Sequence, residues 1–326
     1  MHIFLTGASG FIGKNLVPYL LSRECQLTCL LRDPNRLPEE LRSQVAVVVG
    51  DVTDIGPAVA GALASVEAVV HLAGCLWGHT YDAFDRVNRQ GTEALVTAVN
   101  QANMPLRRFV QLSTLAAAGP ARPGEPLTED SPVAPISWYG QTKLGGERAL
   151  AAAGFPWSII RPPTVYGPHD QDVWRFFKMA ARHLRPSLRG GHLELSLIHV
   201  RDVCQAIWLV LTRETRPQST YFINDGQAIH YLRDVTALVA EAVRTWTIPV
   251  PLPGGLVRLA EGVMAIGRLV GLKPARLTPD KLRELRQGAW TCSADLITEQ
   301  LGFKPSVRLA QGITETTAWY RAHGWL

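Results

Sequence analysis

Tyr139 and Lys143 stand four residues apart at the start of a predicted helix, Ser137–Ala152, so they share one helix face. A tyrosine hydroxyl has a pKa of about 10 in model peptides, too high for ready proton exchange near neutral pH. A neighbouring ammonium favours the phenolate, and an oxidised nicotinamide would reinforce it. Lowering this pKa by about two to three, worth about 3–4 kcal/mol, makes Tyr139 a general acid for reduction or a general base for oxidation. Read alone, the spacing is common by chance and is more typical of a pair on a helix surface.

Two hydroxyl residues, Ser113 and Thr114, follow the predicted strand Arg108–Leu112. Open α/β sheets bind ligands at the carboxyl ends of their strands. A hydroxyl at this position can hydrogen-bond a substrate carbonyl or alkoxide and orient it for hydride transfer. Capping of the strand end explains an isolated Ser-Thr pair at least as well.

Three glycines separate a short apolar strand, His2–Leu5, from an amphipathic helix, Phe11–Ser22, with the spacing G-x-x-G-x-x-G. Such glycines let backbone N–H groups approach a pyrophosphate, and the helix N-terminus adds its partial positive charge. A glycine-rich turn in an ordinary α/β protein is the alternative, but the flanking strand and helix favour nucleotide binding. We therefore predict a cofactor-binding turn made by Gly7, Ser9, Gly10, Phe11, Ile12 and Gly13.

The turn after the next predicted strand, Gln26–Leu31, decides between NAD and NADP. An acidic residue there bonds both ribose hydroxyls and favours NAD, whereas an arginine pairs with a 2′-phosphate and favours NADP. Arg32 makes NADP(H) the preferred prediction, although a solvated surface arginine is the bland alternative, and Asp33 keeps NAD(H) open. Asp51, with Val52 beside it, follows the third strand and is placed either to touch the adenine or to cap a turn.

The elements that position these residues alternate between strand and helix through the first half of the chain. Several of the strands are nearly continuous apolar runs, typical of a parallel sheet covered on both faces. The predicted strands are His2–Leu5, Gln26–Leu31, Val45–Val49, Ala68–Leu72, Arg108–Leu112 and Trp157–Arg161. The predicted helices are Phe11–Ser22, Val59–Leu63, Tyr81–Asn103 and Ser137–Ala152. This alternation predicts an α/β fold with a doubly wound parallel sheet, the Rossmann arrangement.

The regular alternation fades after Arg161, where Pro-Pro, Gly-Pro and Gly-Gly pairs break the chain into loops. We predict a dinucleotide-binding Rossmann domain over residues 1–165 and a smaller, mainly substrate-binding α/β lobe over 166–326. Segments near 200–224, with a helix at Asp202–Thr212 and a strand at Thr220–Ile223, are expected to rejoin the main sheet. No internal repeat or low-complexity tract is visible.

Several single features have a structural and a functional interpretation. Pro249–Pro253 indicates a rigid connector, and Asp202, before an apolar helical run, is more typical of an N-cap than of a ligand. His71 ends an apolar strand, so a buried core histidine is favoured over a catalytic one. Trp77 is equally a substrate wall or a packed loop residue. Leu256–Leu272 has apolar residues near helical spacing, for which core packing is favoured over a lid or a membrane-surface helix.

Composition narrows the partners. The 326 residues carry a net charge of +5, with no basic stripe interleaved with aromatics, so no nucleic-acid binding is expected. An anionic cofactor or substrate accounts for the charge. The five cysteines lack metal-ligand spacing, which predicts no metal and free thiols in a reducing cytoplasm. No uncharged run reaches the roughly 20 residues of a membrane span, and no signal peptide precedes the first strand.

The motifs occur together in the order of a known family. They are Thr6-Gly7-Ala8-Ser9-Gly10-Phe11-Ile12-Gly13, Asp51, His71-Leu72-Ala73-Gly74, Asn88 with Gly91-Thr92, Ser113-Thr114, Tyr139 with Lys143, and Arg161-Pro162-Pro163-Thr164-Val165-Tyr166-Gly167-Pro168. With them the chain resembles the extended short-chain dehydrogenase/reductases, also called the NAD-dependent epimerase/dehydratase family. The resemblance covers essentially the whole chain.

The resemblance implies a role for each matching residue. Tyr139 would be the catalytic acid/base, and Lys143 would lower its pKa and bind the nicotinamide ribose. The family's catalytic hydroxyl falls on Thr114, where serine is commoner, and Ser113 is the less favoured candidate. A homodimer through the helices Tyr81–Asn103 and Tyr139–Ala152 is the family expectation. Further implied cofactor contacts are Leu72, Ala73, Gly74, Asn88, Pro163, Thr164 and Val165.

Differences from the motifs of individual subgroups of this family narrow the range of reactions that we expect. Sugar-nucleotide dehydratases carry an Asp-Glu pair where this chain has Leu115-Ala116, and Glu194–Ile198 lacks the arginine with which epimerases hold sugar-nucleotide phosphates. The stretch Ser113–Pro120 instead resembles hydroxysteroid dehydrogenases and dihydroflavonol reductases. We therefore predict an NADP(H)-dependent oxidoreductase that interconverts an alcohol and a carbonyl on a fairly apolar small molecule.

Two alternatives come from other functional classes. The first is a nucleotide-sugar epimerase with tightly bound NAD. The second is a non-catalytic dinucleotide-binding protein, which is disfavoured because such proteins often lose the tyrosine or the lysine, and this chain keeps both Tyr139 and Lys143.

Overall fold

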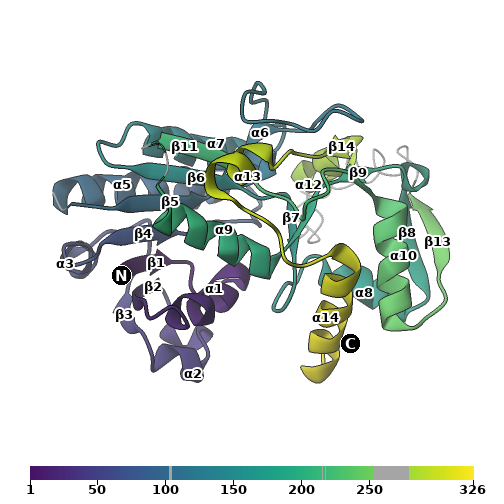
Figure 1. Cartoon of the computed structure of the whole chain (residues 1–326), viewed down its shortest axis with the longest axis horizontal. Helices are drawn as coiled ribbons and strands as arrows, with labels where there is room; N and C mark the ends of the chain where they lie inside the picture. The colour runs from purple at the N-terminus through teal and green to yellow at the C-terminus, as the bar shows by residue number, and fades with distance from the viewer. Residues whose placement is uncertain (103–104, 215, 217, 253–278) are drawn as a thin grey trace, which may run out of the picture.

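A seven-stranded parallel sheet forms the centre of the larger lobe (Figure 1). The computed structural model describes residues 1–102, 105–214, 216, 218–252 and 279–326. The strand order is β11-β6-β5-β4-β1-β2-β3. The strands are β1 (His2–Thr6), β2 (Gln26–Leu31), β3 (Ala46–Val49), β4 (Ala68–His71), β5 (Arg108–Leu112), β6 (Trp157–Arg161) and β11 (Gln218–Phe222). This sheet confirms the doubly wound α/β class.

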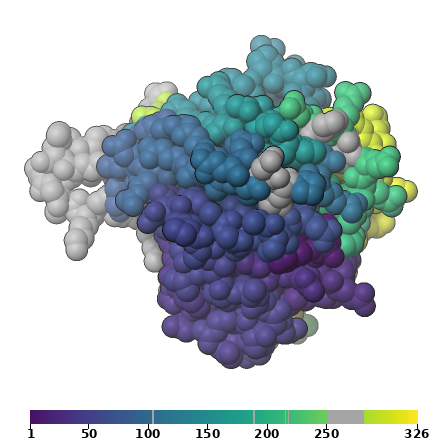
Figure 2. Space-filling view, turned by 90° about the vertical axis from the view of Figure 1, so that its left-hand side faces the viewer, coloured from purple at the N-terminus to yellow at the C-terminus, as the bar shows by residue number. Residues whose placement is uncertain are grey.

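Both faces of the sheet are covered by helices, because successive residues of each strand point to opposite sides. In β1, Ile3 and Leu5 pack in one apolar cluster and Phe4 in the other. The first face carries α1 (Phe11–Leu21), α9 (Val200–Thr212) and α13 (Asp295–Leu301). The second face carries α3 (Pro57–Leu63), α5 (Gly91–Ala102) and α7 (Trp138–Ala151). In Figure 2, residues of the first part of the chain, coloured purple to blue, form one continuous face.

In its described part, the second lobe gathers three small sheets and three larger helices around a separate apolar cluster. Its paired strands are β7 (Thr164–Tyr166) with β10 (Leu197–His199), β9 (Glu194–Leu195) with β12 (His230–Tyr231) and β14 (Ala289–Trp290), and β8 (Leu184–Leu188) with β13 (Ile248–Leu252). Its larger helices are α8 (Trp174–Ala181), α10 (Leu232–Val243) and α14 (Leu309–Ala322). The shorter helices among the described residues are η1 (Pro34–Arg36), α2 (Glu39–Arg42), α4 (Tyr81–Asp85), η2 (Arg86–Gln90), α6 (Leu115–Ala118), η3 (Arg189–Gly191) and α12 (Pro279–Leu285).

The predicted connector at Pro249–Pro253 is wrong for its described part, because Ile248–Leu252 forms strand β13, parallel to β8. The backbone N–H of Ile248 donates to the carbonyl of His183, so the nitrogens of Pro249 and Pro251 face the opposite, unpaired side. Proline is tolerated on such an edge because no ladder hydrogen bond is lost there. The amphipathic stretch Leu256–Leu272 lies outside the described residues.

The predicted continuous helix Tyr81–Asn103 is also only partly correct. Its middle, Arg86–Gln90, is a π-helical turn between α4 and α5. Hydrophobic periodicity does not register one extra residue in a turn, which is why the sequence pattern missed it. Across the described part of the chain, no helix has the length and apolar character needed to cross a membrane.

Candidate active site

The predicted site segments all follow the carboxyl ends of neighbouring strands. Strand β1 lies between β2 and β4, where the direction of chain progression reverses, and open α/β sheets bind ligands in that crevice. The structure therefore brings together the segments that sequence reasoning selected. They are Gly7–Gly13 after β1, Arg32 after β2, Asp51 and Val52 after β3, Leu72–Gly74 after β4, Thr114 after β5, and Pro163–Val165 after β6.

The three positions of the first turn require or permit glycine for different physical reasons. Gly7 has a φ of +75°, and a Cβ there would lie 2.7 Å from the backbone nitrogen of Ala73. A Cβ on Gly13 would lie 2.3 Å from the carbonyl oxygen of Gly7. Gly10 is exposed, and the only neighbour of its Cβ position within 4 Å would be the same oxygen at 3.2 Å. Gly7 and Gly13 thus permit close packing, while Gly10 leaves an open approach to the turn.

The start of helix α1 is suited to an anion. Gly10 is its N-cap, no side chain caps it, and its first turn contains no acidic residue. The first backbone N–H groups of a helix have no partner within the helix. Ser9, Phe11 and Ile12 around this N-terminus are partly exposed. These residues fit a dinucleotide pyrophosphate.

The adenosine end of the crevice contains one arginine and two aspartates. The side chain of Arg32 is 67% exposed, with Nη1 3.7 Å from Oδ2 of Asp51. Asp51 Oδ1 accepts from the backbone N–H of Thr53 at 3.0 Å, the turn contact that was the alternative interpretation. Asp33 Oδ1 accepts from Asn35 N–H at 3.0 Å and caps η1. Asp33 is therefore engaged by its own turn, whereas Arg32 projects into solvent.

The π-helical turn places Asn88 under the loop after β4. Asn88 is fully buried, and its Oδ1 accepts from the N–H of Cys75 at 2.8 Å. Its Nδ2 donates to the carbonyl of Cys75 at 3.1 Å and to Thr142 Oγ1 of helix α7 at 3.0 Å. A Cβ on Gly74 would lie 3.3 Å from Asn88 Oδ1 and 3.9 Å from Lys143 Nζ. π-Turns often occur at functional sites, and here the turn joins the two segments beside Lys143.

His71 is a core residue, as its apolar strand predicted. Its Nδ1 lies 2.7 Å from Thr6 Oγ1, and its Nε2 lies 3.0 Å from Thr92 Oγ1. Burial lowers its pKa to about 3, and the nearby Lys143 acts in the same direction. The imidazole is therefore neutral at physiological pH and links the glycine turn to the segment after Asn88.

Thr114 and Tyr139 meet because two helices begin side by side. Thr114 is the N-cap of α6, and its Oγ1 accepts from the N–H of Ala116 at 3.2 Å. A Cβ on Gly140 would lie 2.2 Å from the carbonyl oxygen of Ala116, so only glycine allows α7 to start this close to α6. The hydroxyl of Tyr139 is consequently within hydrogen-bonding reach of Thr114. Ser113 instead donates to Glu147 and is buried.

Lys143 is buried beneath these hydroxyls, and its Nζ donates to the carbonyl of Leu112 at 2.7 Å. Burial lowers the pKa of its ammonium to about 8, against the opposing effect of Glu147. Burial raises the pKa of Tyr139 well above its ordinary range, while the hydrogen bond with Thr114 lowers it. The prediction that the Tyr-Lys spacing lowers the pKa of Tyr139 is therefore wrong for the protein alone, since desolvation outweighs it.

A buried ion pair supports this group, and sequence reasoning gave it no role. Arg161 Nη2 donates to Glu147 Oε2 at 2.6 Å, and Arg161 Nε donates to Glu147 Oε1 at 3.0 Å. Their side chains are 8% and 4% exposed. Glu147 lies four residues after Lys143 on the same helix, and this i, i+4 spacing was the available signal.

The mouth of the site has an aromatic border. Trp77, in the loop after β4, is 41% exposed, and the guanidinium of Arg175 in α8 lies 5.3 Å from its ring centroid. Leu76 and Tyr81 beside it are 55% and 40% exposed. The ring of Phe84 lies 6.5 Å from that of Tyr139. The loop after β4 thus contacts the second lobe through Trp77, and α4 contacts Tyr139 through Phe84.

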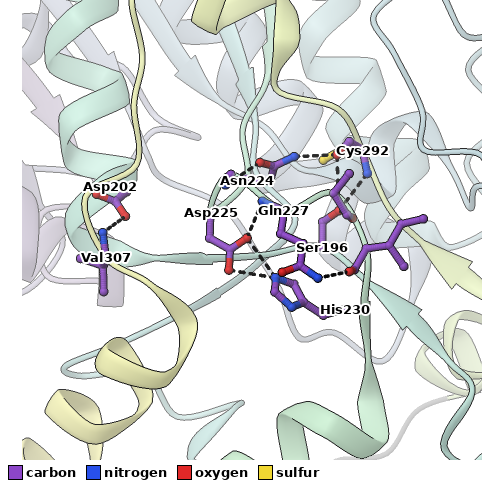
Figure 3. A network of polar contacts seen from close by, with 11 residues as sticks. Ser196, Asp202, Asn224, Asp225, Gln227, His230, Cys292 and Val307 are labelled. Atoms are coloured by element: carbon purple, nitrogen blue, oxygen red, sulfur yellow. Dashed lines mark hydrogen bonds and ion pairs between the residues drawn. The ribbon is translucent and has the colours of Figure 1, made fainter.

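Asp202 is not the N-cap that its position suggested, because His199 caps α9. Asp202 Oδ1 accepts from the N–H and Oγ of Ser306, at 2.9 and 2.7 Å, and Oδ2 accepts from Val307 N–H at 3.1 Å. Figure 3 shows the Asp202–Val307 contact beside a separate polar network of the second lobe. In that network, His230 Nε2 lies 2.9 Å from Asp225 Oδ2. The Asp202 contacts join the start of α9 to the segment before α14, and the His230–Asp225 contact joins two neighbouring segments of the second lobe.

Among the described residues, no group of three or more His, Cys, Asp or Glu side chains has an arrangement that could hold a metal ion. The five cysteines are free, and Cys75 is the one among them that is not buried.

The family model described as "NAD dependent epimerase/dehydratase family" matches residues 3–223. The chain belongs to this family. It is an NAD(P)-dependent oxidoreductase of the extended short-chain dehydrogenase/reductase type.

Curated relatives include reductases and dehydrogenases. The chain is 30% identical to a ceramide reductase of Caulobacter vibrioides, over 99% of this chain and 96% of the relative. It is 28% identical to a 3-beta-hydroxysteroid dehydrogenase of Mycolicibacterium neoaurum, over 70% of this chain and 67% of the relative.

Solved structures share the fold. The crystal structure of gox2253 has a TM-score of 0.79 at 24% identity and covers 99% of both chains. DesIV, a dTDP-glucose 4,6-dehydratase from Streptomyces venezuelae solved with NAD and TYD, has a TM-score of 0.77 at 23% identity, covering 100% of this chain and 98% of its own.

Proposed function

We propose that the protein is an NADP(H)-dependent oxidoreductase that interconverts an alcohol and a carbonyl on a fairly apolar small molecule. The observation that carries this proposal is the convergence of Thr114, Tyr139 and Lys143 at the carboxyl edge of the sheet, beside the Gly10 turn. A bound nicotinamide would supply or accept the hydride. The residues of the chain would do the rest of the chemistry.

Each of the three residues has a distinct task in this mechanism. Thr114 binds the substrate oxygen and orients the carbonyl carbon. Tyr139 donates its proton to that oxygen during reduction and takes it back during oxidation. Lys143, held by the carbonyl of Leu112 at 2.7 Å, keeps further N–H groups with which it would bind the nicotinamide ribose.

Arg32 supports NADP(H) over NAD(H). Its guanidinium is 67% exposed, and its contact with Asp51 is long, at 3.7 Å. A surface pair of this kind is weak and is readily exchanged for a phosphate. Asp33, the residue that would favour NAD, is engaged by Asn35 N–H.

The aromatic border supports an apolar substrate. Leu76, Trp77 and Tyr81 expose large side chains in the loop after β4 and at the start of α4, the helix whose Phe84 ring lies 6.5 Å from that of Tyr139. Exposed apolar patches of this kind often mark ligand-binding grooves. Two of the relatives, a ceramide reductase and a 3-beta-hydroxysteroid dehydrogenase, agree by name with this substrate class.

We also propose the division into residues 1–165 and 166–326, a cytoplasmic location and a homodimer through α5 and α7. The cytoplasmic location is supported by the five free cysteines, which are typical of a reducing compartment.

The test is Tyr139→Phe in a hydride-transfer assay. Following NADPH and NADH absorbance with apolar ketones, we expect turnover to fall at least about 100-fold, because general acid catalysis of this kind contributes about 10²–10⁴-fold. Tyr139 is itself one of the proposed cofactor-binding residues, but its phenol would supply only one of many cofactor contacts, so cofactor affinity, measured by fluorescence, should change less than about twofold. The matched control is Tyr231→Phe, which removes an exposed hydroxyl in the second lobe.

Retained turnover in Tyr139→Phe would refute the assignment of the acid. Activity on nucleotide sugars without added cofactor would instead identify the epimerase alternative.

A further inference from the structure

A buried carboxylate from the second lobe reaches the start of α7, the catalytic helix that carries Tyr139 and Lys143. Glu284 lies in α12, and its Oε1 accepts from Ser137 Oγ at 2.7 Å. Ser137 is the N-cap of α7, and the same Oγ accepts from the N–H of Gly140 at 3.1 Å. Tyr139 stands between these two residues in the first helical turn. Ser137 and Glu284 are 0% and 8% exposed, so the contact is dry.

Glu284 is itself held in place from two sides. Lys281 Nζ donates to its Oε2 at 2.7 Å, and the indole Nε1 of Trp290 donates to its backbone carbonyl at 2.9 Å. Trp290 belongs to β14, which pairs with β9 of the second lobe. The backbone of Glu284 is therefore anchored to the framework of that lobe, while its carboxylate pairs with Lys281, whose side chain is 48% exposed.

We propose that Glu284 is a positioning residue that fixes the cap of the catalytic helix and biases Tyr139 to serve as the proton donor in carbonyl reduction. The inference rests on the proposed function for its second part. A positive helix N-terminus favours a phenolate at this position in α7, and a nearby carboxylate opposes it.

The charges around Tyr139 agree with this role. Besides burial, the charges of Glu284 and Asp172 both raise the pKa of its hydroxyl, and Glu284 has the larger effect of the two. The polar and charged groups that act on the hydroxyl come from four separate segments. They are Cys75 after β4, Thr114 after β5, Asp172 before α8 and Glu284 on α12. Lys143 lies one helical turn further along α7.

The first test uses the pH dependence of reduction. At saturating cofactor, where the titration of Lys143 does not limit binding, the reduction rate falls at high pH when Tyr139 loses its proton, and this high-pH limb of the profile reports the pKa of the hydroxyl. Glu284→Gln keeps an oxygen that accepts from Ser137 but removes the charge, so we expect the limb to move down by roughly half to one pH unit. Lys281→Met removes the cation paired with Glu284 and should move the limb up. The control is Glu315→Gln, which removes a carboxylate of α14 that pairs with Arg201. It should leave the high-pH limb unchanged.

The second test does not need turnover. Hydrogen exchange of the peptide that contains Gly140 reports the cap directly, because Ser137 protects that N–H. We expect Glu284→Ala to speed this exchange several-fold, and more than Glu284→Gln does. Unchanged exchange in Glu284→Ala would overturn the positioning role.

The two readouts separate the possible failures. If the limbs of wild type and Glu284→Gln coincide, the charge of Glu284 does not act on Tyr139 and the proton-donor bias is wrong. If wild type reduces no ketone with either cofactor, the proposed function is wrong, and the proton-donor bias that rests on it is wrong as well. Hydrogen exchange still decides whether Glu284 positions the helix cap.

Discussion

The buried Glu147–Arg161 pair beneath Lys143 provides a quantitative test of the structure. Glu147→Gln removes one charge and leaves Arg161, which is 8% exposed, without its bidentate partner. Breaking a buried pair in this way costs about 3–5 kcal/mol, because the remaining charge stays desolvated. At about 2 °C per kcal/mol for a chain of this size, the melting temperature should fall by roughly 6–10 °C.

Urea unfolding of the protein without cofactor measures this loss. The free energy of unfolding should drop by the predicted amount with no change in the slope against urea. The matched control is Glu93→Gln. Glu93 pairs with Arg89 at a similar distance of 2.9 Å, but its side chain is 45% exposed, so its loss should cost less than about 1 kcal/mol.

A double variant identifies the cause. Glu147→Leu with Arg161→Met replaces both charges by apolar groups, and it should be more stable than Glu147→Gln alone because no unpaired charge remains. A loss below about 1 kcal/mol in Glu147→Gln, or a double variant that loses the sum of its two single variants, would refute the reasoning.

Two further predictions concern cofactor binding. Arg32→Ala should weaken NADPH about tenfold, the loss of one exposed charge-assisted contact, while NADH changes less than about twofold; equal losses for both, measured by fluorescence titration, would show that Arg32 does not select the 2′-phosphate. Lys143, whose pKa burial lowers from 10.5 to about 8, should lose its proton as the pH rises through about 8. Cofactor affinity should therefore weaken between about pH 7 and 9, and a flat profile in wild type, or a sloping one in Lys143→Met, would contradict this. Because the folded pKa lies below the unfolded one, the contribution of Lys143 to stability is greatest above 10.5 and is lost as the pH falls toward 8.

The larger lobe was predictable because its determinants are local. Apolar runs such as Ala68–His71 and Trp157–Arg161 are buried along their whole length, and each strand carries its polar site residues directly at its carboxyl end. The order of strands then brings these ends together without further information. Thr114 and Lys143 could be placed for the same reason.

The parts that were missed depend on contacts between distant residues. Asp202 binds Ser306, and Ser137 binds Glu284, across separations of 104 and 147 positions. No sequence pattern around either residue of these pairs indicates which distant residue it will contact. The pKa of Tyr139 was missed for a related reason, since the Tyr-Lys spacing shows the neighbouring ammonium but not the desolvation that the fold imposes on both groups.

The unequal surroundings of the three glycines mean that different selective pressures preserve them. A methyl group at Gly7 or Gly13 would collide with the backbone at 2.7 or 2.3 Å, so any lineage that lost either glycine would lose the folded lobe first. A methyl group at Gly10 meets one atom at 3.2 Å, so the chain could drift there and still fold. A descendant that kept Gly7 and Gly13 but replaced Gly10 would be recognisable as a folded relative that had given up its nucleotide.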